Sequence, residues 1–99
     1  MEIAIQSIRF EASTKLEAFI QKKVNRLSKF NDDILSSDVT LKVIKPETNE
    51  NKDASIKLFL SGTELFAQEV ADTFEEAINK CVRKLERQVV RHKEKQREK

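Results

Sequence analysis

The residues that build metal and catalytic sites are scarce in this 99-residue sequence. One cysteine cannot form an internal disulfide, and one cysteine with one histidine is too few for a zinc site, which usually needs three or four such ligands. A single glycine is too few for a phosphate-binding loop. Cys81 lies on an apolar helix stripe and His92 in a charged tail, so no catalytic set emerges. We expect neither an enzyme nor a cofactor or metal.

Long apolar runs are also missing. No stretch approaches the roughly 20 apolar residues that cross a membrane, and the opening Met1-Glu2-Ile3-Ala4-Ile5 is unlike a secretory signal. We therefore expect a cytoplasmic protein without a membrane partner. Apolar residues make up 38% of the chain and charged residues 36%, which is typical of one compact domain. Tryptophan and tyrosine are absent, so six phenylalanines are the only aromatic side chains.

Charge is unevenly distributed along the chain, although its net value is only +2. Residues 15–30 carry a net charge of +4 and residues 80–99 carry +6, whereas residues 31–79 carry −7. Two basic segments separated by an acidic one favour a polyanionic partner.

Alternation of apolar and polar residues predicts four strands. We place them at residues 2–8, 39–43, 54–60 and 63–70. A two-residue turn at Ser61-Gly62 would join the last two as a hairpin, in which Leu58 pairs with Leu65. Pro46 and the polar residues 47–53 predict a loop before the third strand.

Apolar residues three and four positions apart predict a first helix of about 15 residues. Its apolar positions are Leu16, Phe19, Ile20, Val24, Leu27 and Phe30. Ser13 or Thr14 would cap its start, and Thr14 with Glu17 fits a capping box. Asn31-Asp32-Asp33 would end it.

A second helix is predicted after a cap at Asp72 or Thr73. Its apolar stripe consists of Phe74, Ile78, Cys81, Val82, Leu85 and Val89. The stripe stops after Val90, so we expect residues 91–99 to form a charged extension that projects and frays.

This element order predicts an α+β fold of two layers, β-α-β-β-β-α, with both helices on one face of a four-stranded sheet. The open face would carry Thr40, Lys42, Lys57, Phe59, Glu64, Phe66 and Gln68. Phe59 and Phe66 could stack on single-stranded RNA. They lack the glycine-aromatic signature of RNA-recognition motifs, so an exposed or cross-strand aromatic pair is the favoured interpretation.

Basic side chains follow one polar face of each predicted helix. The first row is Lys15, Lys22, Arg26 and Lys29, with Lys23 beside it, and the second is Lys80, Lys84, Arg87 and Arg91, with Arg83 adjacent. If the helices pack side by side, the two rows form one surface that can contact several phosphates. The alternative is that these charged faces are only solvated.

The sequence resembles the ribosome hibernation promoting factors, also called ribosome-associated inhibitors and formerly sigma-factor modulation proteins. The resemblance covers nearly the whole chain. It is strongest at residues 84–93, Lys-Leu-Glu-Arg-Gln-Val-Val-Arg-His-Lys, which are similar to the family's Lys-Leu-x-Arg-Gln-Leu-x-Lys-His-Lys. Further matches are Leu16-Glu17-Ala18-Phe19-Ile20 with Lys23, Arg26-Leu27 and Phe30, and Ala77-Ile78-Asn79.

The resemblance implies a fold similar to double-stranded RNA-binding domains. It also implies binding to the decoding region of the small ribosomal subunit, where the protein would exclude messenger and transfer RNA and so inhibit translation. By the motif match, the residues that contact the RNA backbone are Lys22, Lys23, Arg26, Lys84, Arg87, Arg91 and Lys93. From the two basic rows we add Lys29, Lys80 and Arg83 as RNA-binding residues.

Two features depart from the family pattern. Phe74 lies one residue further from Ile78 than the family's usual aromatic, so the start of the last helix could be shifted. The sequence ends at Lys99, without the dimerising second domain of the family's long forms. Whether the protein pairs ribosomes is therefore open. We expect a single ribosome-binding domain over residues 1–99 that is monomeric when free and takes no small-molecule substrate.

A protein-interaction module is the second interpretation. The apolar stripe of the last helix would then pair with a partner helix. It spans only about two heptads and is also needed for the core, so this interpretation ranks below RNA binding.

Overall fold

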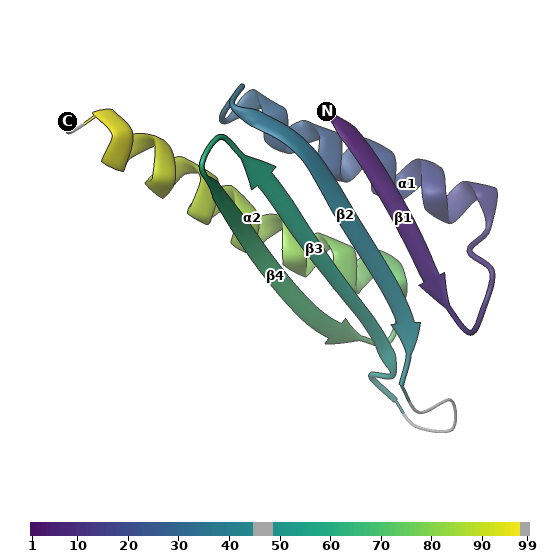
Figure 1. Cartoon of the computed structure of the whole chain (residues 1–99). Helices are drawn as coiled ribbons and strands as arrows, with labels where there is room; N and C mark the ends of the chain where they lie inside the picture. Colours follow the sequence, from purple (N-terminus) through teal and green to yellow (C-terminus); the bar gives the residue numbers. More distant parts are fainter. Residues whose placement is uncertain (45–48, 98–99) are drawn as a thin grey trace.

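The computed structural model describes residues 1–44 and 49–97, and all six predicted elements are present (Figure 1). The strands are β1 (Glu2–Ile8), β2 (Ile34–Val43), β3 (Lys52–Leu60) and β4 (Thr63–Ala71). The helices are α1 (Thr14–Asn25), which continues into the 3₁₀ helix η1 (Arg26–Lys29), and α2 (Phe74–Arg97).

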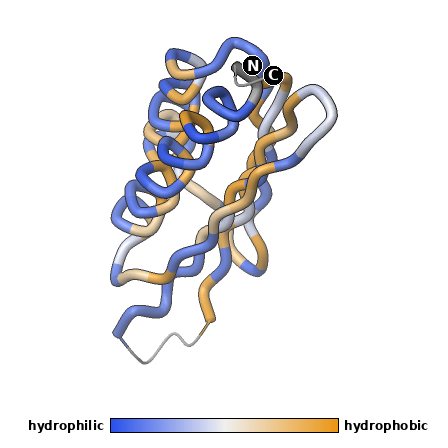
Figure 2. The backbone as a smooth tube through the Cα atoms, turned by 90° about the vertical axis from the view of Figure 1, so that its left-hand side faces the viewer, coloured by the Kyte–Doolittle hydropathy of each residue, from blue (hydrophilic) through white to orange (hydrophobic). Residues whose placement is uncertain are grey.

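The strands form one sheet in the order β1-β2-β3-β4. The β1 strand runs parallel to β2, and the other two pairings are antiparallel. Both helices lie on the same face of the sheet, so the chain forms two layers (Figures 1 and 2). The predicted α+β architecture is confirmed.

The core lies between these layers. All six predicted apolar positions of α2 are buried, with at most 7% of any of them exposed. In β3, Ala54, Ile56, Leu58 and Leu60 face the helices, and each is at most 4% exposed. Burial of this apolar surface is the main force that holds the layers together.

The β3–β4 hairpin has the predicted register. Leu58 pairs with Leu65 and Ile56 with Ala67. Gly62 in the turn has a φ of +78°, a conformation that side chains with a Cβ rarely adopt. The one glycine of the chain is therefore used for this turn.

The structure shows which of the two candidate residues caps the start of each helix. The Ser13 Oγ accepts a hydrogen bond from the Leu16 backbone N–H at 3.0 Å, so Ser13 is the N-cap and the predicted capping box at Thr14 is wrong. The Thr73 Oγ1 accepts one from the Glu76 N–H at 3.1 Å, and α2 begins directly after it.

Phe74 is the first residue of α2 and is buried. Its ring stacks on Phe10 with centroids 4.9 Å apart and planes 7° from parallel. This contact holds the start of α2 against the segment between β1 and α1.

Two strand boundaries differ from the prediction. The β2 strand begins at Ile34, earlier than predicted. Two features hid this start from a test of simple alternation: the register shifts between Ile34 and Ser36, and the buried position 37 holds a serine where an apolar residue is expected. The β3 strand begins at Lys52, so the predicted loop was too long; Lys52 and Asp53 pair with the end of β2. Residues 46–48 of that loop lie outside the described residues.

The α2 helix continues past Val90 to Arg97, and its end lies beyond the β3–β4 turn (Figure 1). Whether this end frays in solution stays a prediction. Within the described residues, no helix is long and apolar enough to cross a membrane.

Candidate nucleic-acid interface

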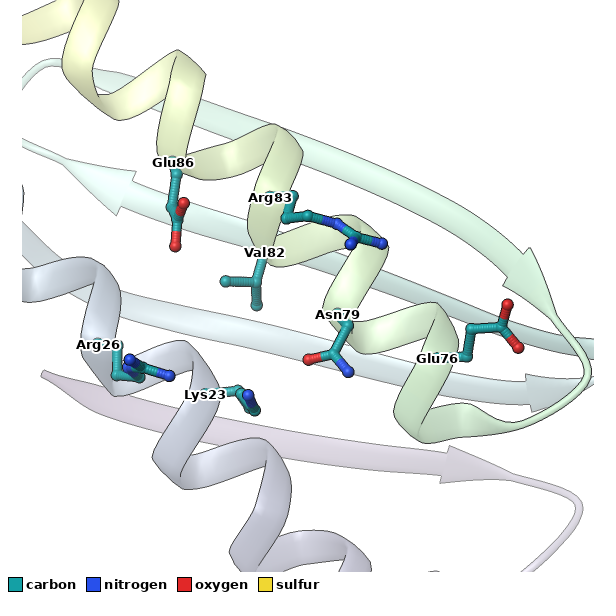
Figure 3. A pocket seen from close by; sticks show the side chains of 7 residues that line it. All are labelled: Lys23, Arg26, Glu76, Asn79, Val82, Arg83 and Glu86. Atoms are coloured by element: carbon teal, nitrogen blue, oxygen red, sulfur yellow. The ribbon is translucent and has the colours of Figure 1, made fainter.

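A groove of about 490 Å³ lies between α1 and α2 (Figure 3). The α1–η1 segment contributes Lys23 and Arg26, and α2 contributes Arg83. The other lining residues, all from α2, are Glu76, Asn79, Val82 and Glu86. The helices thus pack side by side, and three of the predicted RNA-binding residues line one groove.

Packing of the two helices positions these basic side chains. Lys23 precedes Val24 on α1, and Arg83 follows Val82 on α2; both valines are buried. The Lys23 Nζ lies 5.6 Å from the centre of the Phe19 ring, close enough for a cation–π interaction. Buried residues therefore fix the helix faces while the charged ends remain at the groove.

Three further basic residues of α2 lie on its outer side. Lys84, Arg87 and Arg91, together with Gln88, line a second, smaller hollow of about 210 Å³. The Lys84 Nζ forms an ion pair with Glu69 of β4, and the Gln88 Nε2 donates to the Phe66 carbonyl at 3.1 Å. Lys84 and Gln88 therefore turn toward β4, whereas Arg83 lies at the groove. That the two basic rows act as one surface stays a prediction.

The four other predicted residues are lysines that line neither of these two surfaces. Lys80 lies 3.9 Å from the Glu76 carboxylate, one helical turn earlier. Lys22 and Lys29 are exposed on α1 and η1, and Lys93 is half-buried on α2. Among residues 1–44 and 49–97, Lys22, Lys29 and Lys93 form no ion pair.

The sequence argument missed two acidic residues in the groove. Glu76, Asn79, Arg83 and Glu86 follow one another at steps of three, four and three, which places them on one helix face. That spacing was a usable signal. Glu86 projects from α2 toward α1 (Figure 3), and its carboxylate forms no ion pair within the described part of the chain.

The open sheet face is separate from this interface. Phe66 is 50% exposed, and Phe59 is half-buried, with the Lys57 Nζ 6.0 Å from its ring centre. Lys57 pairs with Phe66 across the strands, and Phe59 pairs with Glu64, so the two aromatic residues are diagonal neighbours.

Cys81 is fully buried on α2, where its Sγ donates to the Ala54 carbonyl at 3.4 Å. Burial, aided by the nearby Glu69 carboxylate, raises the pKa of the thiol to about 12. This environment is that of an unreactive cysteine. Within the residues that the structure describes, no three histidine, cysteine or acidic side chains are grouped as a metal site.

Comparison with known proteins defines the family. Residues 3–97 match the family described as sigma 54 modulation protein / S30EA ribosomal protein, and the chain belongs to it. It is 29% identical over 96 residues to a ribosome hibernation promoting factor from Azotobacter vinelandii, covering 97% of this chain and 86% of the relative. The predicted resemblance to hibernation factors is confirmed.

Solved structures agree with this fold. The N-terminal domain of Thermus thermophilus Protein Y superimposes with a TM-score of 0.82 at 26% identity, covering 93% of this chain and 99% of that one. A ribosomal subunit interface protein from Coxiella burnetii gives 0.83 at 22% identity, covering 94% and 98%. The second likeness supports the fold alone. The family description and the relatives' names denote ribosome-associated factors and no enzyme.

Proposed function

We propose that this protein binds the small ribosomal subunit in the cytoplasm, occupies its decoding region and thereby inhibits translation. Family membership supports association with the ribosome. The observation that carries the RNA contact is the convergence of Lys23, Arg26 and Arg83, from two helices, on one groove.

Basic residues on two neighbouring helices suit folded RNA better than a single row would. Structured RNA is recognised mainly by its shape and its phosphate backbone, and two helices can reach phosphates of different RNA segments at once. The residues proposed to contact RNA are Lys22, Lys23, Arg26, Lys29, Lys80, Arg83, Lys84, Arg87, Arg91 and Lys93. The protein acts by occlusion, as a monomer without cofactor, and does not transform a substrate.

The alternative of a helix-pairing module is disfavoured. It requires the apolar stripe of α2 to face a partner, but that stripe packs against the protein's own sheet and α1. Ile78, Cys81 and Leu85 have no exposed surface, so they are not available to a second protein.

Co-sedimentation with purified small subunits tests this proposal. The variant Arg26→Glu/Arg83→Glu reverses two charges of the groove, and Lys42→Glu/Lys57→Glu reverses two on the open sheet face. Both pairs change the net charge by the same amount. We expect the first variant to lose subunit binding and inhibition of cell-free translation, and the second to retain both, with circular dichroism confirming that each is folded. Equal binding by the two variants, or no binding by the unaltered protein, would refute the proposal.

A further inference from the structure

An apolar pocket of about 350 Å³ lies where η1 ends beside α2. Phe30 and Val90 line it, and they are 38% and 39% exposed although most apolar residues of the helices are buried. The rest of the lining is charged: Glu86, Arg87, Arg91 and Glu94. Phe30 was expected on the apolar stripe of the first helix, but it leaves part of its ring open to solvent.

This pocket is continuous with the candidate interface. Glu86 lines both the pocket and the groove between the helices. Arg87 and Arg91 line both the pocket and the basic outer side of α2. The pocket around Phe30 therefore lies between the groove and the basic outer side of α2.

The chemistry of the pocket matches an unpaired nucleobase. Single-stranded segments of RNA are recognised by stacking on aromatic rings and guanidinium planes, and Phe30 with the two arginines provides both. A carboxylate accepts hydrogen bonds from an exocyclic amino group such as N4 of cytosine, and Glu86 lies at the pocket edge. A partner helix would need apolar anchors over several turns, whereas this pocket offers only Phe30 and Val90.

We propose that the pocket binds one unpaired RNA base, stacked on Phe30 with its amino group on Glu86. Arg87 and Arg91 neutralise the adjoining phosphates. This inference rests on the proposed function, because it names a feature of the RNA that the same surface binds.

A tryptophan reporter tests the stacking directly. The chain contains no tryptophan or tyrosine, so Phe30→Trp introduces a single reporter of emission at the pocket. We expect small subunits to quench this emission, because a stacked base quenches indole fluorescence. The matched control is Phe66→Trp, on the open sheet face, whose emission should not change. A blue shift without quenching at position 30 would indicate burial against protein and would overturn the proposal.

Affinity measurements separate stacking from charge. Phe30→Leu keeps an apolar side chain but removes the ring, and we expect it to weaken subunit binding about tenfold. The factor should be the same at every salt concentration, because lost stacking releases no counterions. Phe30→Trp should bind like the unaltered protein, and its quenching decides the question if the leucine variant is unstable.

The two proposals fail in different ways. Unchanged affinity of Phe30→Leu, while Arg26→Glu/Arg83→Glu loses binding, overturns the base pocket alone. Unchanged affinity of both variants overturns the proposed RNA interface as well.

A pair of oligonucleotides tests the role of Glu86. In Phe30→Trp, oligocytidine should bind about fivefold more tightly than oligouridine, which has a carbonyl in place of the amino group. Adding Glu86→Ala should abolish the difference. A difference that persists without the carboxylate would refute the assignment of Glu86.

Discussion

Arg83 and Lys84 are neighbours in α2, yet we expect them to contribute unequally to RNA binding. The Arg83 side chain is exposed at the groove between the helices. Lys84 is ion-paired with Glu69 of β4, whose side chain is only 22% exposed. A lysine whose charge is already compensated attracts phosphate less strongly than a free arginine.

The size of the difference follows from counterion release. Each phosphate contact adds about 0.7–0.9 to the slope of log affinity against log salt, so Arg83→Ala should flatten the slope by that amount. Lys84 must first leave Glu69. A partly exposed ion pair is worth at most about 1 kcal/mol, which corresponds to about a fivefold loss of affinity. We therefore expect Lys84→Ala to lower the affinity less, and to flatten the slope less, than Arg83→Ala does.

Equilibrium binding to small subunits between about 50 and 200 mM salt, the range over which such slopes are clear, measures both variants. Glu69→Gln is the matched control, because it removes the competing carboxylate charge. This variant should bind up to about fivefold more tightly than the unaltered protein. If Lys84→Ala flattens the slope as much as Arg83→Ala does, and Glu69→Gln leaves the affinity unchanged, then the ion pair with Glu69 does not weaken the contact of Lys84 with RNA. That result would refute the prediction.

Three further predictions concern stability. In urea denaturation, Ser13→Ala should lower the free energy of unfolding by about 1 kcal/mol, and Thr14→Ala should lower it by less than about 0.5 kcal/mol. Equal losses in the two variants would contradict the assignment of Ser13 as the cap. Leu85→Ala removes a side chain with no exposed surface and should cost about 2–5 kcal/mol; a loss below about 1 kcal/mol would contradict its core position. The pKa of the Cys81 thiol is about 12 in the folded state and about 9 in the unfolded state. The buried neutral thiol should therefore contribute fully to the free energy of unfolding below about pH 9, and this contribution should fall as the pH rises above that value. Unfolding at pH 7–11 checks this against Cys81→Ala, and native Cys81 should resist thiol reagents at pH 8; identical pH profiles or rapid labelling would contradict its burial.

Local patterns in the sequence were enough to predict the elements and their layers. Alternation in β3 and β4 set the hairpin register, because a slip of one residue would turn Leu58 and Leu65 away from the helices. The apolar stripe of α2 identified its buried face for a similar reason, since residues three and four apart share one side of a helix. The same spacing identified the basic residues as a surface feature.

Tertiary structure alone decided which basic residues lie together. Helical spacing gives directions around an axis, but it does not say which side meets α1 and which meets β4. Packing of α2 on the sheet places Arg83 toward Lys23 and Arg26, while it turns Lys84 to Glu69, far away in sequence. The exposure of Phe30 likewise depends on where η1 ends beside α2. Both features depend on contacts between different elements, so they cannot be predicted from the spacing of residues within one element.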